Sequence, residues 1–148
     1  MGIEKDINQK TFRSEYQKSI INIIYTHNWL KEKIQSFFDK EDLTSQQFNI
    51  LRILRGSETP LSTLQIRERM LDKMSDTSRI VDRLMLKGLV KKVTSKTDKR
   101  LVDITISLKG KKVLEKMDPF ETDFEKLLQN LSIDEAQTLN TLLDKIRQ

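Results

Sequence analysis

Residues 61–112 constrain the fold more than any other part of the chain, because two short helical patterns run directly into a hairpin pattern. The segments LSTLQIRERM and SDTSRIVDRLMLKG carry apolar residues at helical spacing, and LVKKVTSKTDKRLVDITIS contains two strand-forming runs joined by a polar tip. Ser62 with Gln65 predicts a capping box that opens the first helix, and Ser75 is the predicted N-cap of the second. This order of elements predicts a winged helix-turn-helix.

The second helix and the hairpin can be outlined further from the same pattern. Gly88 is predicted to end the helix, because glycine is favoured directly after the last helical turn. The inward face of the helix is predicted to consist of Thr77, Ile80, Val81 and Leu84. The two strands are predicted over residues 89–94 and 101–107, with residues 96–99 at the tip.

Helical patterns flank this region on both sides, so the chain is predicted to be mainly α. Apolar residues recur every three or four positions from Phe12 to Phe38, which predicts one long amphipathic helix. Two further capping boxes, Thr44 with Gln47 and Ser132 with Glu135, predict the starts of other helices. After Ser107 another helix is predicted, which Pro119 is expected to kink or divide.

Positive charge is concentrated on the hairpin. Residues 87–112 contain nine basic and two acidic side chains, a net charge of +7, whereas the whole chain carries +5. A localised positive field beside a helix-turn-helix is typical of proteins that bind double-stranded DNA. A docking module for an acidic protein partner is the alternative that the charge pattern leaves open.

Composition argues against several other classes of protein. The chain has one histidine, no cysteine and no glycine-rich phosphate loop, so we expect no catalytic residues, no metal site and no cofactor. The longest uncharged run, residues 19–30, is shorter than the roughly 20 residues needed to span a bilayer. We therefore expect no membrane association and a cytoplasmic location.

The string VDRLMLKGLVKKVTSKTDKRLVDITISLKG, together with the order of elements, resembles the MarR family of winged-helix transcriptional regulators. The most specific parts are VDRL followed by KGLV, and Asp98-Lys99-Arg100, which is similar to the Asp-x-Arg motif of the family's wing. The resemblance covers residues 43–114 well and the flanking helices in outline. The sequence departs from the family pattern at Leu71, Asp76, Ile106 and Ser107.

The resemblance implies one MarR-type domain over residues 1–148, with the winged helix-turn-helix at about 43–110 and dimerisation helices at about 11–38 and 111–148. It implies a homodimer, more often a repressor, that binds pseudopalindromic operators and is often released by a small aromatic or phenolic ligand. A winged-helix protein-interaction module without sequence-specific DNA binding is the alternative.

The predicted DNA-binding residues lie on the second helix and on the hairpin. In a helix-turn-helix the N-terminal end of the second helix faces the base edges, and a wing arginine can enter the minor groove. Arg79 is the candidate for base contact, although a phosphate contact or a pair with Asp76 or Asp82 is the alternative. The resemblance gives Asp98 the role of orienting the wing. The full set is Ser75, Asp76, Ser78, Arg79, Arg83, Lys91, Lys92, Lys96, Asp98, Lys99 and Arg100.

The flanking helices carry more apolar surface than a small winged domain needs to cover. We interpret it as a dimer interface, with an intramolecular core as the alternative. The predicted interface residues are Phe12, Tyr16, Ile20, Ile23, Phe120, Phe124, Leu139, Leu142 and Ile146. The family's habit of ligand binding suggests Tyr25, His27 and Trp29 as candidates for an effector pocket, although His27 alone is more simply a half-exposed residue of the apolar stripe.

Overall fold

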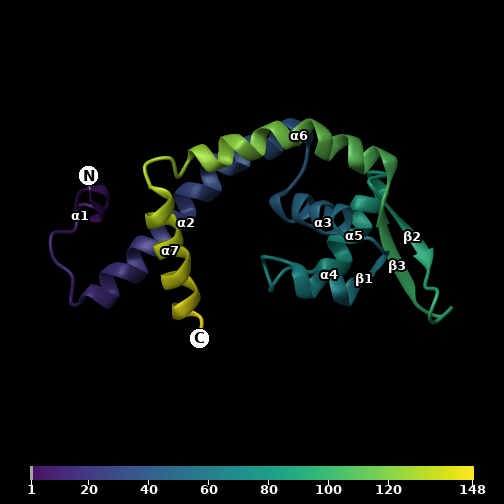
Figure 1. The fold of residues 1–148 in the computed structure, drawn as a ribbon, viewed down its shortest axis with the longest axis horizontal. Helices are drawn as coiled ribbons and strands as arrows, with labels where there is room; N and C mark the ends of the chain where they lie inside the picture. Colours follow the sequence, from purple (N-terminus) through teal and green to yellow (C-terminus); the bar gives the residue numbers. More distant parts are fainter. Residues whose placement is uncertain (1) are drawn as a thin grey trace.

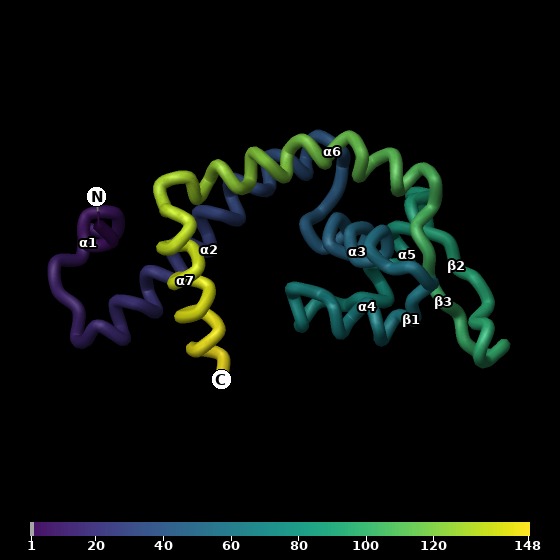
Figure 2. The backbone as a smooth tube through the Cα atoms, viewed as in Figure 1, coloured from purple at the N-terminus to yellow at the C-terminus, as the bar shows by residue number. Residues whose placement is uncertain are grey.

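The computed structural model describes residues 2–148 (Figure 1). The helices before residue 39 and after residue 107 form an arm, and the helices and strands between them form a smaller lobe. The helices are α1 (Ile3–Asp6), α2 (Glu15–Phe38), α3 (Ser45–Arg55), α4 (Thr63–Arg69), α5 (Thr77–Leu86), α6 (Leu108–Lys126) and α7 (Ile133–Ile146), with a 3-10 turn η1 (Asp39–Glu41). The strands are β1 (Leu61–Ser62), β2 (Val90–Thr94) and β3 (Val102–Ile106). Figure 2 shows the chain entering the lobe from α2 and returning to the arm through α6.

All three predicted capping boxes are confirmed. The hydroxyl groups of Thr44, Ser62 and Ser132 each accept a hydrogen bond from the backbone N–H three residues later, at 3.1–3.2 Å. The Gln or Glu side chain at that later position accepts in return from the backbone N–H of the capping residue, at 2.8–3.1 Å. Because these bonds involve only neighbouring residues, they fix the starts of α3, α4 and α7 independently of the tertiary fold.

Two predicted helix starts need correction. The long helix begins at Glu15 and not at Phe12, because the Ser14 side chain accepts from the backbone N–H of Gln17 and caps it there. The N-cap of α5 is Asp76 and not Ser75. A carboxylate is favoured at this position because it adds an ionic attraction to the positive end of the helix dipole.

Pro119 does not divide the helix in which it lies. α6 runs without interruption from Leu108 to Lys126, and Figure 1 shows it as one gently curved ribbon along the arm. Proline removes one hydrogen bond from the helix. The helix is packed against the core on both sides of the proline. Met117 before it is buried in the core, and Phe120 after it packs against the core.

The sheet has three antiparallel strands in the order β1-β3-β2. The hairpin of β2 and β3 pairs Val90 with Ile106 and Thr94 with Val102, which confirms the predicted hairpin within one residue at each end. The two-residue strand β1 pairs Leu61 with Ile104 and was not predicted, because its pairing depends on a residue 43 positions away. β1 therefore attaches the start of α4 to the wing.

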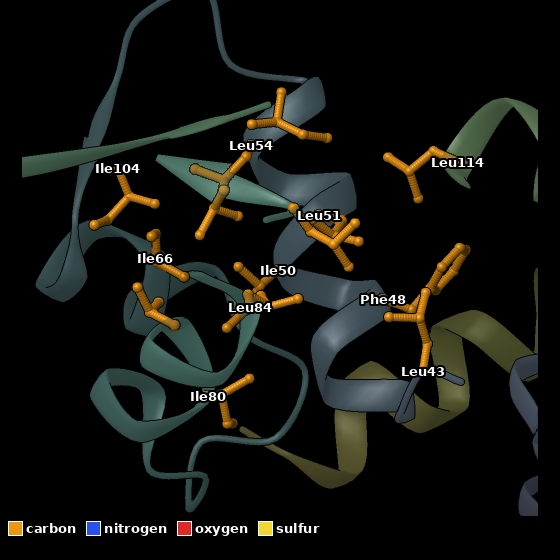
Figure 3. Close-up of a cluster of buried hydrophobic side chains, with 14 of the residues drawn as sticks. Leu43, Phe48, Ile50, Leu51, Leu54, Ile66, Ile80, Leu84, Ile104 and Leu114 are labelled. Carbon is orange, nitrogen blue, oxygen red and sulfur yellow. The ribbon is translucent and has the colours of Figure 1, made fainter. Parts of the chain in front are cut away.

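One hydrophobic core fills the lobe. Ile50 and Leu51 of α3, Ile66 of α4, Leu84 of α5 and Ile104 of β3 are each at most 1% exposed. Figure 3 shows these side chains converging between the helices and the sheet, with Leu114 of α6 approaching from the side of the arm. The predicted inward face of α5 is confirmed, since Thr77, Ile80, Val81 and Leu84 are all buried. This core fixes the positions of α4, α5 and the hairpin relative to one another.

Aromatic contacts join α2 to α6 within the arm, and an ion pair joins α6 to the lobe. The Phe37 ring of α2 lies 5.6 Å from that of Phe120 and 4.9 Å from that of Phe124, both in α6. Arg55 of α3 makes two hydrogen bonds to the Asp118 carboxylate of α6, at 2.8 and 3.0 Å. Phe120 and Phe124 pack within their own chain and partly cover its core, and both remain half-buried, so their assignment to a dimer interface stays a prediction.

The outer part of the arm keeps its apolar side chains exposed. Tyr16, Ile20 and Ile23 on α2 are exposed, as are Leu139, Leu142 and Ile146 on α7, and α7 has no buried residue. Phe12 is half-buried, with the Lys18 ammonium 5.8 Å from the centre of its ring.

A hydrogen bond to Lys18 lowers the pKa of Glu4, and the same bond raises the pKa of Lys18.

Candidate nucleic-acid interface

The N-terminal end of α5 presents short polar side chains and one arginine. The Asp76 carboxylate accepts a hydrogen bond from the backbone N–H of Arg79 at 3.2 Å, so it is engaged with the helix end. The Ser75 hydroxyl donates to the backbone carbonyl of Asp72 at 2.6 Å and closes the turn before the helix. Ser78 and Arg79 are exposed, while Thr77 between them is buried.

The polar face of α5 leaves Arg79 available and engages Asp82. Asp82 pairs with Lys92 of β2 at 3.2 Å, which connects α5 to the hairpin. Within residues 2–148 the guanidinium groups of Arg79 and Arg83 form no ion pair within 4.0 Å. The alternative in which Arg79 pairs with Asp76 or Asp82 is therefore not the arrangement in this structure, and both arginines are exposed.

A groove of about 420 Å³ lies between α4 and the start of α5. It is lined by Thr63, Leu64, Arg67, Ser75, Asp76, Thr77 and Ser78. Thr63 and Arg67, one turn apart on α4, add a hydroxyl and a positive charge that the sequence analysis did not include. Their four-residue spacing on the polar side of a short helix was the available signal.

The wing tip is folded by local hydrogen bonds that leave Arg100 extended. The Asp98 carboxylate accepts from the backbone N–H of Arg100 at 2.9 Å, and its carbonyl accepts from the N–H of Leu101 at the same distance. The Arg100 Nε lies 3.9 Å from the Asp98 carboxylate, and the Arg100 side chain is 94% exposed. Asp98 therefore shapes the tip chiefly through the backbone, and the guanidinium stays accessible to a ligand.

The hairpin lysines are distributed along the strands and the tip. Lys91, Lys92, Lys96 and Lys99 are all exposed, and Lys92 is the one that pairs with α5. Lys96 also lines a concave region of about 750 Å³ between the wing and the start of α4. The structure thus brings the predicted basic residues to the surface on the same lobe as the exposed end of α5, with the wing extending from it in Figure 1.

A separate cavity of about 400 Å³ lies where the arm meets the lobe. Its lining combines apolar side chains with a few polar and basic ones: His27, Leu30, Lys31, Ile34, Gln35, Phe38, Ser45, Phe48, Asn49, Arg52, Leu71 and Phe124. Of the three residues suggested for an effector pocket, His27 lines this cavity, and Tyr25 and Trp29 do not. The prediction of Tyr25 and Trp29 rests on their place on α2 and on the family's habit of ligand binding, whereas the cavity is formed where α2 faces α3 and α6.

Residues 2–148 contain neither a metal-binding cluster nor a membrane-spanning helix. No group of three or more His, Cys, Asp or Glu side chains is arranged to hold a metal ion. No helix in this part of the chain is long and apolar enough to cross a membrane.

Comparison with known proteins gives consistent results. Residues 41–101 match the model of the MarR family. The multiple antibiotic resistance protein MarR of Salmonella typhimurium is 29% identical over 129 residues, covering 84% of this chain and 88% of that protein. A mutant MarR from Escherichia coli, solved in complex with operator DNA, is 26% identical with a TM-score of 0.72, over 84% of this chain and 91% of that one. Bordetella bronchiseptica BpsR has a TM-score of 0.80 at 19% identity, covering 93% and 98% of the two chains, and shows the shared fold.

A winged helix-turn-helix with an exposed second helix, a basic wing and a helical arm defines a winged-helix transcriptional regulator. The matched region contains α3, α4, α5 and most of the wing, and the relatives extend the similarity into the arm. Residues 41–101 of this chain are similar to the MarR family, and the chain as a whole shares the fold of a solved MarR regulator.

Proposed function

We propose that this chain is a homodimeric repressor that binds a pseudopalindromic operator with α5 in the major groove and the wing in the minor groove. The observation that carries this proposal is the accessible pair of arginines, Arg79 and Arg100, on a lobe whose hairpin region has a net charge of +7. Arginine on a recognition helix can bind guanine with two hydrogen bonds, and arginine on a wing is attracted to narrow minor grooves. By covering promoter DNA, the dimer would compete with RNA polymerase.

The remaining predicted side chains have complementary roles in this proposal. Ser75, Asp76 and Ser78 face the bases together with Arg79, and Asp76 contributes through its cap of α5. Arg83 and the hairpin lysines contact phosphates, which positions the protein without reading sequence. Because the Asp82–Lys92 pair joins α5 to the hairpin, the two contact regions are expected to bind as one unit.

The cavity at the junction of arm and lobe is proposed to bind a small aromatic or phenolic ligand that releases the operator. Phe38, Phe48 and Phe124 supply aromatic walls, and Arg52 and His27 supply hydrogen-bond donors for an anionic or hydroxyl group. Leu71, which belongs to the turn between α4 and α5, also lines the cavity. A ligand there would contact the arm, α3 and the segment leading into α5, so it could change their relative position.

The proposal is tested by selecting duplexes from a random DNA pool with the purified protein, followed by affinity measurements across salt concentration. The expected result is an inverted repeat with half-sites about one helical turn apart, bound with a steep salt dependence. The selected duplex then allows aromatic and phenolic compounds to be screened for displacement. Weak binding without sequence enrichment and without salt dependence would instead support a protein-interaction module.

A further inference from the structure

We propose that Lys87 is a positioning residue for DNA binding, because it fixes the C-terminal end of α5 to the segment that connects α2 with α3. Lys87 belongs to the basic region of the sequence, yet its ammonium group faces the protein and not a DNA ligand. The inference rests on the proposed DNA-binding function and concerns how the orientation of α5 is set.

The position of Lys87 on α5 determines where its side chain points. Lys87 follows the buried Ile80 by seven residues, which is two helical turns, so it lies on the inward side of the helix. Its Nζ donates to the backbone carbonyl of Asp42 and lies 3.4 Å from the Asp42 carboxylate. The same Nζ lies 3.4 Å from the side-chain oxygen of Gln47, which is 5% exposed. A single ammonium group thus lies against three oxygen atoms of the α2–α3 connection and of α3, of which the Asp42 carboxylate is also fully exposed to solvent.

A second set of contacts holds the same helix end from the other side. The Lys109 ammonium donates to the backbone carbonyl of Lys87 at 2.9 Å. The buried Ser107 hydroxyl donates to the carbonyl of Gly88 at 2.7 Å, and the Ser107 N–H donates to the carbonyl of Leu89 at 3.0 Å. The three accepting carbonyls belong to residues 87–89, which directly follow the end of α5 at Leu86, so these donors hold the segment that leads from α5 into β2.

These contacts connect α5 to both helices of the arm. Asp42 directly follows η1 at the end of α2, and Ser107 is the N-cap of α6. The C-terminal end of α5 is therefore held between the two places where the chain passes between arm and lobe (Figure 2). Because a dimer must place two α5 helices in successive major grooves, an error in this orientation is expected to weaken binding even where every DNA-contacting side chain is intact.

The test compares Lys87→Met with Lys91→Met in the full-length protein, using the duplex selected by the wild type. Both variants lose one positive charge, and methionine keeps the unbranched apolar stem. We expect Lys87→Met to weaken binding roughly tenfold with an unchanged salt slope, since it removes charge-assisted hydrogen bonds inside the protein. Lys91→Met, a phosphate contact, is expected to weaken binding and to lower the salt slope by about one. Lys87→Arg keeps the charge and the donors and should recover most of the lost affinity.

Two results would overturn the inference: wild-type affinity in Lys87→Met, or a salt slope that falls as in Lys91→Met. Amide hydrogen exchange tests the contact of Lys87 within the protein in the absence of DNA. Amides in the last turn of α5 are expected to exchange roughly tenfold faster in Lys87→Met, with those of α7 unchanged, because the local opening is less opposed. Unchanged exchange at α5 would refute the positioning contact. If the wild type selects no duplex, the proposed function fails while this exchange measurement still decides the structural claim.

Discussion

At the scale of single residues, the wing tip separates two tasks between neighbouring side chains. Asp98 holds the backbone by accepting from the N–H of Arg100, and Arg100 keeps its guanidinium in solvent. An aspartate at the tip of a basic wing would at first be expected to repel phosphate. Its use as a backbone acceptor explains how it can shape the wing while the arginine remains free for DNA.

Arg100→Ala is expected to weaken operator binding about tenfold or more, because a groove-inserted arginine contributes on the order of 1–3 kcal/mol. The free energy of unfolding should change by less than about 0.5 kcal/mol, since the side chain is exposed. Affinity for the selected duplex and urea unfolding measure the two effects. Arg13→Ala, which removes an equal charge before α2 in the arm, is the control. Equal affinities of the two variants would show that the wing does not insert.

At the scale of elements, the start of α6 crosses the chain between α5 and β2 at very close range. A Cβ atom on Gly110 would lie 2.3 Å from the carbonyl oxygen of Leu89 and 2.8 Å from a side-chain carbon of Ile106. Neither neighbour can move freely, because one is backbone and the other is buried in the core. Glycine is therefore required at this crossing by lack of space and not by backbone conformation.

Gly110→Ala is expected to lower the free energy of unfolding by about 3 kcal/mol, because the added methyl group has no space in a packed region. Gly56→Ala is the matched control. Gly56 has φ −78°, and its nearest atom to an added Cβ is 3.4 Å away, so a change below about 1 kcal/mol is expected there. Urea unfolding of both variants measures the difference. Similar stabilities would mean that α6 can shift away from the crossing.

The elements of this fold were predictable where their causes are local. The capping boxes at Thr44, Ser62 and Ser132 involve residues three apart, and the hairpin follows from adjacent strand-forming runs. The contacts of Lys87 were not predictable, because its partner Asp42 lies 45 positions away. The cavity lining was missed for the same reason. The predicted N-cap of α5 was Ser75 and the observed one is Asp76. Spacing alone therefore cannot decide which of two adjacent side-chain acceptors caps a helix.

The apolar faces of the arm divided in a way that spacing could not foresee. Phe120 and Phe124 follow the same apolar helical spacing as the exposed outer residues of the arm. They nevertheless pack on Phe37 of the same chain. Only the tertiary arrangement distinguishes the part of α2 that α6 covers from the part that remains exposed. The residues proposed to contact DNA could be named from the sequence because the motif that resembles the family includes the second helix and the wing.

At the scale of the whole molecule, the exposed apolar faces of α2 and α7 are the surfaces proposed to pair in the homodimer. Ile20→Asp is expected to raise the dimer dissociation constant more than tenfold, because it places a charge in an apolar contact. Sedimentation across protein concentration measures this change. Leu108→Asp, which alters an exposed leucine at the lobe end of α6, should remain dimeric. A monomeric wild-type protein at micromolar concentration would contradict the dimer itself.

In the proposed homodimer, pairing through the exposed face of the arm also determines how DNA occupancy responds to the amount of protein. When two chains must associate before either half-site is read, the concentration of the binding species rises with the square of the chain concentration below the dimer dissociation constant. Twofold dilution of the chains then removes about three quarters of the dimers. A cell that doubles its volume without resynthesis would consequently lose proportionally more of the proposed dimer than of the chain itself.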